Sequence, residues 1–538
     1  MDRFTRRRMI GVLASAAVLP KLSRPATAAA SAEFLDIREF GAVGDGVTVN
    51  TDAIQKAIDT GAANGGGTVL VPNGKYVTGT LFLKSNLTLC VDAGAWLLGS
   101  SKIADYTPGT HRMMYAGESL MDRCLIFARD AVNIGMQGKG TIDGQGRSFP
   151  NDGDPLQNRP MLVRLVNCRN VFLRDLTLQN PASWTSAFLY CNDIRVDGLN
   201  LWSRAVEGCD GLVFDGCQDV RVSNCRLDNS DDSICLQSSE SSSPVRNVTI
   251  ANCIISSQWA AIRIGLLSRS AFESIVVSNC VFHDIAGEAL KIQLAEGGRM
   301  NNLLFSNIIM KNVARPVFLT FNSFPFRVDS PGEPPPMQRL CNVMFSDMHI
   351  EADRSAPDSR NSFLAVLGLP GHPIEDITFN NIYFTAPGGG NKEDAARRAV
   401  PELAGIRPER QPLGQVLPSY VAYVRHARHL RLSKVTLQTG ERDLRPAVVC
   451  DDVEDLELAN VRLGADPDTE APILLHNTKH AMIQGSGPLG RGLAFLRVEG
   501  RDTREIVLMG NDLHGSKRVL DLGKDVPEKT VTENGNIR

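Results

Sequence analysis

The sequence has few aromatic residues, no excess of positive charge and, beyond its first thirty residues, no long apolar run. Phe, Trp and Tyr make up 6% of the 538 residues, and the formal net charge is -3. No later stretch approaches the about 18 apolar residues that a membrane-spanning helix needs. A membrane or nucleic-acid partner is therefore not expected. What is abundant, 43% hydrophobic residues and 47 glycines, is typical of a globular fold with many short strands and turns.

Residues 1–30 have the composition of an export signal. Arg6, Arg7 and Arg8 precede a short apolar run, and small residues suited to cleavage follow at 28–32. The segment resembles a twin-arginine signal, although Met9 replaces the usual Phe and leaves the general secretory route open. Removing it leaves 51 Lys+Arg against 59 Asp+Glu, a net charge of about -8. We predict a periplasmic or secreted protein.

Twelve cysteines in an exported protein would ordinarily indicate disulfides. The spacing of Cys225, Cys253 and Cys280 argues otherwise, because these residues stand in the phrases SNC, ANC and SNC, 28 and 27 residues apart. Such spacing marks one position repeated on successive structural units. We predict stacked, buried thiols that act as small apolar side chains.

A nine-residue pattern of alternating apolar positions recurs along the chain. Its starts are 23, 26, 28, 27 and 28 residues apart. The phrases are NVFLRDLTL (170–178), DIRVDGLNL (193–201), DVRVSNCRL (219–227), NVTIANCII (247–255), SIVVSNCVF (274–282) and NLLFSNIIM (302–310). Alternation indicates strands with one buried face, and a constant repeat without helices indicates strands that stack on their counterparts one turn later. The pattern predicts an all-β, right-handed parallel β-helix; a β-propeller, with longer repeats, is the weaker alternative.

The domain prediction follows from this repeat. We expect residues 31–538 to form one β-helix domain with Pro-, Gly- and charge-rich loop insertions near 322–336 and 385–414, which would wall a groove. Ile54, Ala57, Ile58 and Gly61 have helical spacing after a potential Thr51 cap. We expect this helix to cover the open N-terminal end of the solenoid, where unpaired strand edges would otherwise be exposed.

Two adjacent carboxylates, Asp231 and Asp232, stand in the phrase NSDDSICLQS. An isolated Asp-Asp pair is more often a solvated turn. Asp210, however, lies 21 residues earlier, which places it on the adjacent turn of a coil of about 26 residues, and we expect it on the same side. Three converging carboxylates repel one another and raise at least one pKa, as a general acid requires. This arrangement favours catalysis.

The sequence resembles glycoside hydrolase family 28, the polygalacturonases, over roughly residues 34–465. The similarity rests on FGAVGDGVTVNTDAIQKAID, GGGTVLVPNGKYVTGTLFLKSNLTL, GKGTIDGQG, EGCDGLVFDG and SDDSICLQS. It implies an inverting hydrolase of pectin-type polysaccharide without cofactor or metal, with Asp231 as the acid and Asp210 and Asp232 holding and deprotonating the water. Gly208 and Cys209 replace the family's Asn and Thr before Asp210.

The sequence departs from the family after these aspartates. Ala260 stands where the family has the His of its GHG motif, and no His occurs between His111 and His283. From its position in its repeat, His283 is expected to be structural rather than a replacement.

The family's basic RIK motif corresponds here to LKIQ. Lys291 and Gln293 then occupy the positions that grip a galacturonate carboxylate in the family, with one charge fewer. Arg263 either restores that charge as a substrate-binding residue or is a surface residue. Trp184 either stacks on a sugar ring or packs under a loop.

Two other functions fit the same fold. A polysaccharide lyase would use Lys291 or Arg263 as the base, often with Ca²⁺, and a non-catalytic β-helix would only bind carbohydrate. Retention of three aspartates argues against the second, since converging carboxylates without a role destabilise their surroundings. We expect a monomer whose partner is a polysaccharide or oligosaccharide.

Overall fold

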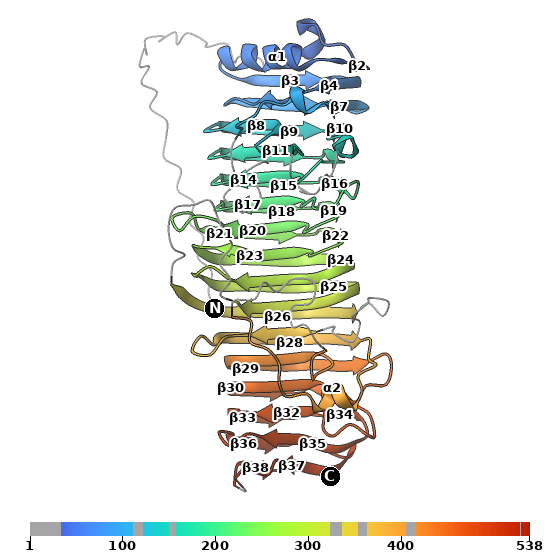
Figure 1. Ribbon diagram of the computed structural model, residues 1–538, viewed down its shortest axis with the longest axis vertical. Coiled ribbons are helices and arrows are strands. Elements are labelled where there is room, and N and C mark those ends of the chain that lie inside the picture. The colour runs from blue at the N-terminus through green and yellow to red at the C-terminus, as the bar shows by residue number, and fades with distance from the viewer. Residues whose placement is uncertain are drawn as a thin grey trace, which may run out of the picture.

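The computed structural model describes residues 34–110, 122–149, 158–322, 336–352, 363–404, 416–527 and 529–538. The chain coils into one elongated solenoid, with strands stacked along its axis and the C-terminus at the far end (Figure 1). Its 38 named strands form one continuous series of parallel pairings, so each strand lies on its counterpart one turn later. The predicted parallel β-helix is confirmed.

Three stacks of strands form the walls of the solenoid. The first stack comprises β1 (Phe34–Asp36), β3 (Gly67–Val71), β6 (Leu87–Val91), β9 (Val132–Gly138), β12 (Arg169–Arg174), β15 (Asn192–Asp197), β18 (Gln218–Ser223), β21 (Val245–Ala251), β33 (Lys479–Gln484), β36 (Arg504–Met509) and β38 (Val531–Asn534). The second comprises β2 (Asp45–Val49), β4 (Gly74–Thr78), β7 (Ala95–Gly99), β10 (Thr141–Asp143), β13 (Thr177–Gln179), β16 (Asn200–Ser203), β19 (Arg226–Asn229), β22 (Ile254–Ser257), β31 (Arg462–Ala465) and β34 (Gly487–Gly490).

The third stack carries the candidate site. It comprises β5 (Leu81–Phe82), β8 (Cys124–Arg129), β11 (Met161–Val166), β14 (Ser186–Leu189), β17 (Leu212–Asp215), β20 (Ile234–Ser238), β23 (Ile262–Ser268), β27 (Leu364–Leu367), β32 (Ile473–His476), β35 (Gly492–Glu499) and β37 (Ser516–Leu522). Six long strands bend through the corners and belong to more than one stack: β24 (Ala271–Leu294), β25 (Gly298–Phe321), β26 (Met337–Ala352), β28 (Ile374–Ala386), β29 (Ala422–Thr439) and β30 (Val448–Ala459).

The repeated phrases align in register, one on the next. Val171 pairs with Ile194, Ile194 with Val220, Val220 with Val248, and Val248 with Ile275. All five side chains are buried in the central core. Burial of apolar side chains stabilises by about 25 cal/mol per Å², so the repeat that was visible in the sequence forms the core of the solenoid.

Polar residues at the corners of each turn adopt the left-handed conformation that allows a sharp bend. Asn224, Asn252, Asn279 and Asn307 have φ values of 54–56°, which Asn tolerates better than most residues. Their amides form ladders along the solenoid; that of Asn307 donates to Asn279 Oδ1 at 2.8 Å. These ladders tie the corners of successive turns together.

All twelve cysteines are free, and all except the half-buried Cys90 are buried. Cys225, Cys253 and Cys280 stack on successive turns, where the carbonyls of Cys225 and Cys253 accept from the residues that follow Cys253 and Cys280. The prediction of buried, unbridged thiols is confirmed.

Helix α1 (Thr51–Ala63) covers the N-terminal end, as expected (Figure 1). Ile54, Ala57, Ile58 and Gly61 are its buried residues. The expected Thr51 cap is wrong, because Asn50 is the N-cap and Thr51 is the first helical residue. The hydroxyl of Thr51 instead accepts from the backbone N–H of Gly79 at 2.7 Å and so ties the helix to the turn beneath it.

Short 3₁₀ helices occur at Ile37–Phe40, Ile103–Asp105 and Gly146–Ser148, and a five-residue helix, α2 (Lys392–Ala396), lies within the second expected insertion. The residues after α2 pack on the outer face of the third stack, where Val400 and Leu403 join an apolar cluster. Residues 1–30 and nearly all of 322–336 lie outside the described residues. In the described ranges, no helix combines the length and apolar character needed to cross a membrane.

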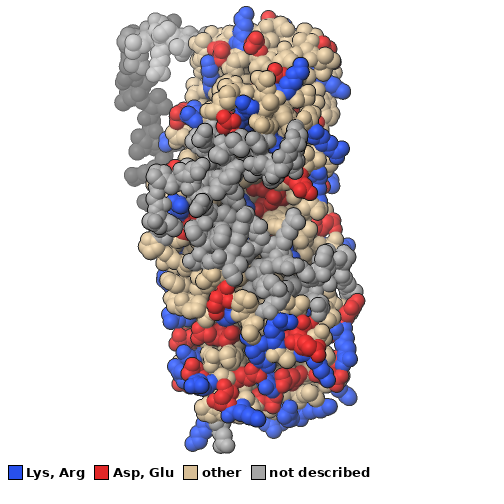
Figure 2. All heavy atoms as spheres, in the orientation of Figure 1, with Lys and Arg blue, Asp and Glu red and all other residues tan. Residues whose placement is uncertain are grey.

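Charged side chains are not spread evenly over the surface. In Figure 2, Lys, Arg, Asp and Glu crowd the C-terminal part of the visible face, whereas tan atoms dominate the N-terminal part. Many of these charges are ladders between turns, such as Arg428 with Glu454 at 3.2 Å and Arg497 with Asp521 at 2.5 Å. The exposed Arg428–Glu454 pair contributes little to stability.

Candidate active site

The outer face of the third stack carries an unusual run of buried polar residues. In β20, Ile234 and Leu236 point into the core, so the alternating Cys235 and Gln237 point outward. Cys235 pairs in register with Arg263 on β23, and Arg263 pairs with Lys291 on β24. A single outward column therefore places a thiol and two cations on successive turns.

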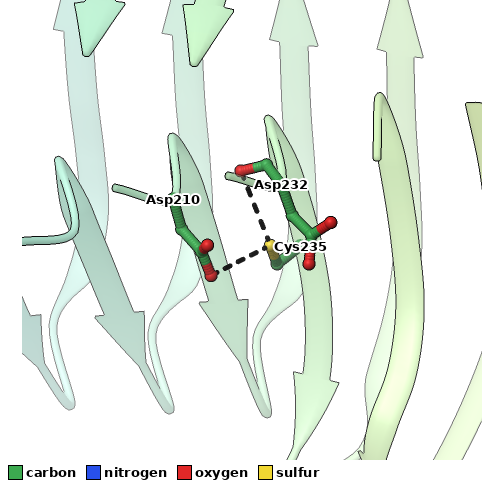
Figure 3. A group of neighbouring side chains, drawn as sticks. All are labelled: Asp210, Asp232 and Cys235. Carbon is green, nitrogen blue, oxygen red and sulfur yellow. Dashed lines mark hydrogen bonds between the residues drawn. The ribbon is translucent and has the colours of Figure 1, made fainter. Parts of the chain in front are cut away.

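The three predicted aspartates converge at the beginning of two neighbouring strands. Asp210 precedes β17, and Asp231 and Asp232 precede β20. The backbone N–H of Gly211 donates to the carbonyl of Asp232 at 2.9 Å, which fixes the two turns side by side. An oxygen of Asp210, an oxygen of Asp232 and the sulfur of Cys235 all lie within 4.8 Å of one another (Figure 3).

The aspartates differ in exposure. Asp210 is 3% exposed and Asp232 is fully buried, whereas Asp231 is half-buried. The backbone N–H of Asp232 donates to Asp231 Oδ1 at 2.9 Å. Asp231 is thus the most exposed of the three aspartates.

Arg263 lies between the two buried aspartates. Its Nη1 lies 2.7 Å from Asp232 Oδ2, and its Nη2 lies 3.6 Å from Asp210 Oδ2. Arg263 is 7% exposed, which excludes the surface-charge interpretation of this residue. The backbone N–H of Ala260, which stands in place of the family's His, donates to Asp232 Oδ1 at 2.9 Å.

Burial and mutual repulsion raise the pKa values of two aspartates. Burial is the main cause of a pKa well above the usual range for Asp210, and the charge of Asp231 adds to it. Burial, followed by the charge of Asp232, raises the pKa of Asp231 to about 6. The guanidinium of Arg263 opposes both increases. Burial and repulsion therefore favour the protonated forms of Asp210 and Asp231, whereas Arg263 favours their ionised forms.

Lys291 belongs to a second buried cluster next to the aspartates. Its Nζ lies 3.6 Å from Glu288 Oε2 and 5.3 Å from the ring centroid of Trp259. Arg315 Nε donates to Glu288 Oε1 at 2.7 Å. Burial raises the pKa of Glu288, but Arg315 and Lys291 outweigh it and hold that pKa below its usual range. Lys291 is therefore already paired with a carboxylate.

Gln293 and Trp184 lie on the same outer face as the aspartates. Gln293 is fully buried and pairs in register with Gly265. Trp184 is 6% exposed and packs in an apolar cluster that also includes Cys235 and Val213. These contacts thus support a packing role for Trp184. Its stacking on a sugar ring stays a prediction. His283 lies on a part of β24 that pairs with the second stack, away from the aspartates, consistent with its expected structural role.

The trio of Asp210, Asp232 and Cys235 has the proximity of a metal site but not its chemistry. Arg263 already pairs with a carboxylate oxygen of Asp232. These donors suit proton chemistry better than cation binding.

Sequence reasoning missed Cys235, Gln237, Glu288 and Arg315. A signal for two of them was available, because residues 28 apart recur as Cys235, Arg263 and Lys291, and as Gln237, Gly265 and Gln293. Applying the repeat spacing to the outward positions would have placed Cys235 and Gln237 beside the predicted site. Glu288 lies at an irregularity in the pairing of β24 with β25, so spacing alone does not reveal it.

The chain is similar in sequence to known proteins. The chain is 29% identical over 354 residues to an exo-poly-alpha-D-galacturonosidase of Dickeya chrysanthemi, covering 55% of this chain and 58% of that protein's length. It is 26% identical to a probable polygalacturonase of Vitis vinifera, covering 64% and 72%.

Two solved structures share the fold. The family 28 exopolygalacturonase of Yersinia enterocolitica has a TM-score of 0.61 at 22% identity, covering 80% of this chain and 78% of that one. The exopolygalacturonase of Thermotoga maritima has a TM-score of 0.59 at 17% identity, covering 76% and 92%. The family model for glycosyl hydrolases family 28 matches residues 68–402, more than half of the sequence. The chain therefore belongs to glycosyl hydrolases family 28.

Proposed function

We propose that this protein hydrolyses glycosidic bonds of a pectin-type polysaccharide by inversion, using Asp210, Asp231 and Asp232. The observation that carries the proposal is the convergence of these carboxyl groups around Arg263 at the start of β17 and β20. The names of the similar proteins, which act on polygalacturonate, support the substrate class.

Asp231 is the general acid in this mechanism. It is half-buried and therefore accessible to a leaving oxygen, and its pKa of about 6 keeps it protonated in mildly acidic solution. A carboxyl group with a raised pKa can donate its proton to the departing glycosidic oxygen.

Asp210 and Asp232 position and activate the water. Their nearest oxygens lie within 4.8 Å of each other, so one water molecule can contact both at about 2.8 Å. Arg263 neutralises part of the charge of this pair. Attack by that water on the face of the sugar opposite the leaving group inverts the anomeric configuration.

The lyase alternative is less well supported by the same contacts. A lyase base must be neutral Lys or Arg, yet Lys291 lies beside Glu288 and Arg263 beside Asp232. Opposite charges at these distances favour the cationic forms. Hydrolysis therefore fits the site better than β-elimination.

The test uses the purified chain and an Asp231→Asn variant on a panel of pectic polymers and oligosaccharides. We expect saturated reducing ends, an inverted anomer in the first NMR spectra, and a fall in kcat/KM as the pH rises through about 6. Asp231→Asn is expected to lower kcat about 10²–10⁴-fold while substrate binding is kept. Asp219→Asn is the matched control. Asp219 has a left-handed backbone conformation at the corner where β18 of the first stack begins. An ultraviolet-absorbing unsaturated product, or unchanged kcat in Asp231→Asn, would contradict the proposal.

We also propose that residues 1–30 direct export, so that the enzyme meets its polymer outside the cytoplasm. The three arginines followed by a short apolar run support this. Replacing Arg6, Arg7 and Arg8 by Ala should leave the protein in the cytoplasmic fraction of a bacterial host; unchanged export would contradict the proposal.

A further inference from the structure

The outer face of the second stack carries a row of apolar side chains that the proposed hydrolysis does not use. Ile254, Val281 and Ile309 pair in register on successive coils. The row continues through His349 and Tyr383, and we call these five residues the apolar row. Ile254, Ile309 and Tyr383 are 46%, 54% and 38% exposed. Large apolar side chains that are exposed side by side mark a binding surface, whereas scattered single ones do not.

A surface cavity lies at one end of the apolar row. Its volume is about 340 Å³, within the range of about 300–1,000 Å³ that is usual for small-ligand sites. Ile309, His349 and Tyr383 line it. The cavity is on the second stack, whereas the aspartates precede strands of the third stack. It is therefore separate from the candidate active site.

Two rings in fixed positions form part of the cavity wall. The rings of His349 and Tyr383 meet edge to face, with centroids 5.0 Å apart and an interplanar angle of 77°. Gln438 Nε2 donates to the hydroxyl oxygens of Tyr383 and Thr385. Tyr383 is thus held by two neighbours while more than a third of its surface stays exposed. A ring that is already fixed loses little conformational entropy when a ligand stacks on it.

Polar side chains from the corner between the first and second stacks complete the lining. Four of them occupy this corner on successive coils: Asn307, Asp347, Asn381 and Lys434. Asn381 Nδ2 donates to Asp347 Oδ1 at 2.7 Å, so the amide oxygen of Asn381 and the second carboxylate oxygen of Asp347 point to further donors. Lys434 adds an exposed ammonium donor. The cavity therefore offers hydrogen-bond donors and acceptors beside its aromatic wall.

This combination of groups matches a sugar. A pyranose ring has an apolar C–H face, which stacks on an aromatic ring, and hydroxyl groups at its rim, each of which both donates and accepts. Asp347 and Lys434 contribute one charge of each sign to the lining, so the cavity does not require a charged sugar. A ligand without hydroxyl groups would leave the polar part of the lining unused.

The shape of the apolar row favours a polymer over a protein partner. Five neighbouring strands carry the row, which gives it a length of about 19 Å, and it is one side chain wide. A stable protein interface buries about 800 Å² on each partner, which a row of this width does not provide. An extended sugar chain is long and narrow, as the row is.

The other end of the apolar row lies on a coil of the active site. Ile254 is on β22, and the chain runs from β22 directly to Ala260, whose backbone N–H donates to Asp232 Oδ1. A polymer held along the row is therefore kept close to the aspartates. Tethering of this kind raises the effective concentration of further bonds at the active site.

We propose that the apolar row and its cavity form a second polysaccharide-binding site, in which sugar rings of the substrate polymer stack on Tyr383 and His349. The identity of the polymer, a pectin-type chain, rests on the proposed function. The site binds without cleaving, because its only carboxylate in the cavity, among the described residues, is that of Asp347, whereas inversion needs two carboxyl groups.

Polymer binding by the Asp231→Asn variant tests this inference without turnover. The probe is polygalacturonate, and affinity electrophoresis at pH 7 measures its dissociation constant. Adding Tyr383→Ala should weaken binding about three- to tenfold, because a stacked ring is lost. Met482→Ala is the matched control, since Met482 is also 38% exposed but lies on β33 of the first stack. Unchanged binding after Tyr383→Ala, an equal loss in the control, or no binding by Asp231→Asn itself would overturn the inference.

Kinetics of the active chain sharpen the test. Tyr383→Ala should raise KM for polygalacturonate about three- to tenfold and leave kcat/KM for the shortest cleaved oligosaccharide within about twofold. Ile309→Ser, at a position that is 54% exposed, should act in the same direction if Tyr383→Ala fails to fold. An equal loss on polymer and oligosaccharide would overturn the inference, because it would place these side chains in the active site.

The competing occupant of the apolar row is a second copy of this chain. Sedimentation velocity of the unaltered chain and of Tyr383→Ala distinguishes the two. We expect the same sedimentation coefficient for both. A dimer that Tyr383→Ala dissociates would overturn the inference.

The two proposals fail separately. If the unaltered chain releases no reducing ends from any pectic polymer while Tyr383→Ala still weakens polygalacturonate binding, the proposed hydrolysis fails alone. If the chain hydrolyses pectic polymers but Tyr383→Ala and Ile309→Ser bind polygalacturonate as tightly as their parent, only the second binding site fails.

Discussion

Two segments of the same outer face, both on the third stack, differ sharply in what they present. On β20, β23 and β24 the outward column is Cys235, Arg263 and Lys291, whereas further along it continues through Phe318, Ala365, Tyr423, Val449 and Leu474. The inward residues of both segments belong to the same apolar core. The fold therefore does not determine which residues lie on the outer face, and the candidate active site occupies only one segment of it.

The apolar segment is covered by the chain's own insertion. Val400, Leu403 and Leu417 join its cluster, and Arg425 anchors the insertion by donating to the carbonyls of Val400 at 2.7 Å and Pro401 at 2.6 Å. In this segment the outward residues serve packing, as inward residues do elsewhere. Substitutions in the two segments should consequently damage different properties.

The largest effect is expected in the charged segment. Asp210→Asn removes one of the two carboxyl groups that we propose hold the attacking water, and it should lower kcat about 10²–10⁴-fold. Because the removed carboxyl is buried and has a raised pKa, the melting temperature at pH 7 should not fall. Initial rates and thermal unfolding measure the two effects, and a large loss of stability with normal turnover would reverse the comparison.

Leu474→Ala should have the opposite profile in the apolar segment. Leu474 is 2% exposed and lies in the cluster that the insertion covers. Its truncation should cost about 2–5 kcal/mol in the free energy of unfolding and leave kcat within about twofold at 25 °C. Urea unfolding and initial rates check this. A kcat that falls as far as in Asp210→Asn would show that the segments are not independent.

A smaller, pH-dependent effect is expected for Asp215 in the charged segment. Burial raises its pKa to about 6, whereas an unfolded Asp titrates near 3.9. The folded protein thus binds this proton more tightly, and its stability falls as the pH rises from about 4 to about 6. Asp215→Asn removes this loss and should gain on the order of 2 kcal/mol at pH 7 relative to pH 4. Urea unfolding at both pH values measures it; an unchanged pH dependence would contradict the assignment.

The sequence predicted the solenoid well because its core positions repeat. The spacing of Val171, Ile194 and Val220 identified the strands and their register, and the cysteine phrases identified the stacked thiols. It also identified the three aspartates, since their separation matched one turn. Thr51 was misplaced by one residue because a hydroxyl next to a helix start is equally suited to bonding the turn below.

The charge pairing beside the aspartates could not be predicted from the sequence. Arg263 was predicted either to bind substrate or to be a surface residue, and its contact with two aspartates depends on side-chain direction rather than on spacing. Glu288 reaches Lys291 and Arg315 where the pairing of β24 and β25 is irregular, and no repeat marks such a position. The apolar segment is covered because the insertion near 385–414 folds back onto it, and the repeat spacing does not indicate where an insertion folds.

The stacking of turns also protects the site from the ends of the molecule. In a solenoid each turn contacts only its neighbours, so fraying proceeds from either end one turn at a time. The aspartates lie at β17 and β20, with many turns on each side (Figure 1). Unfolding that starts at a terminus must therefore open many coils before it reaches the aspartates, and amide hydrogen exchange should be slowest in these central coils.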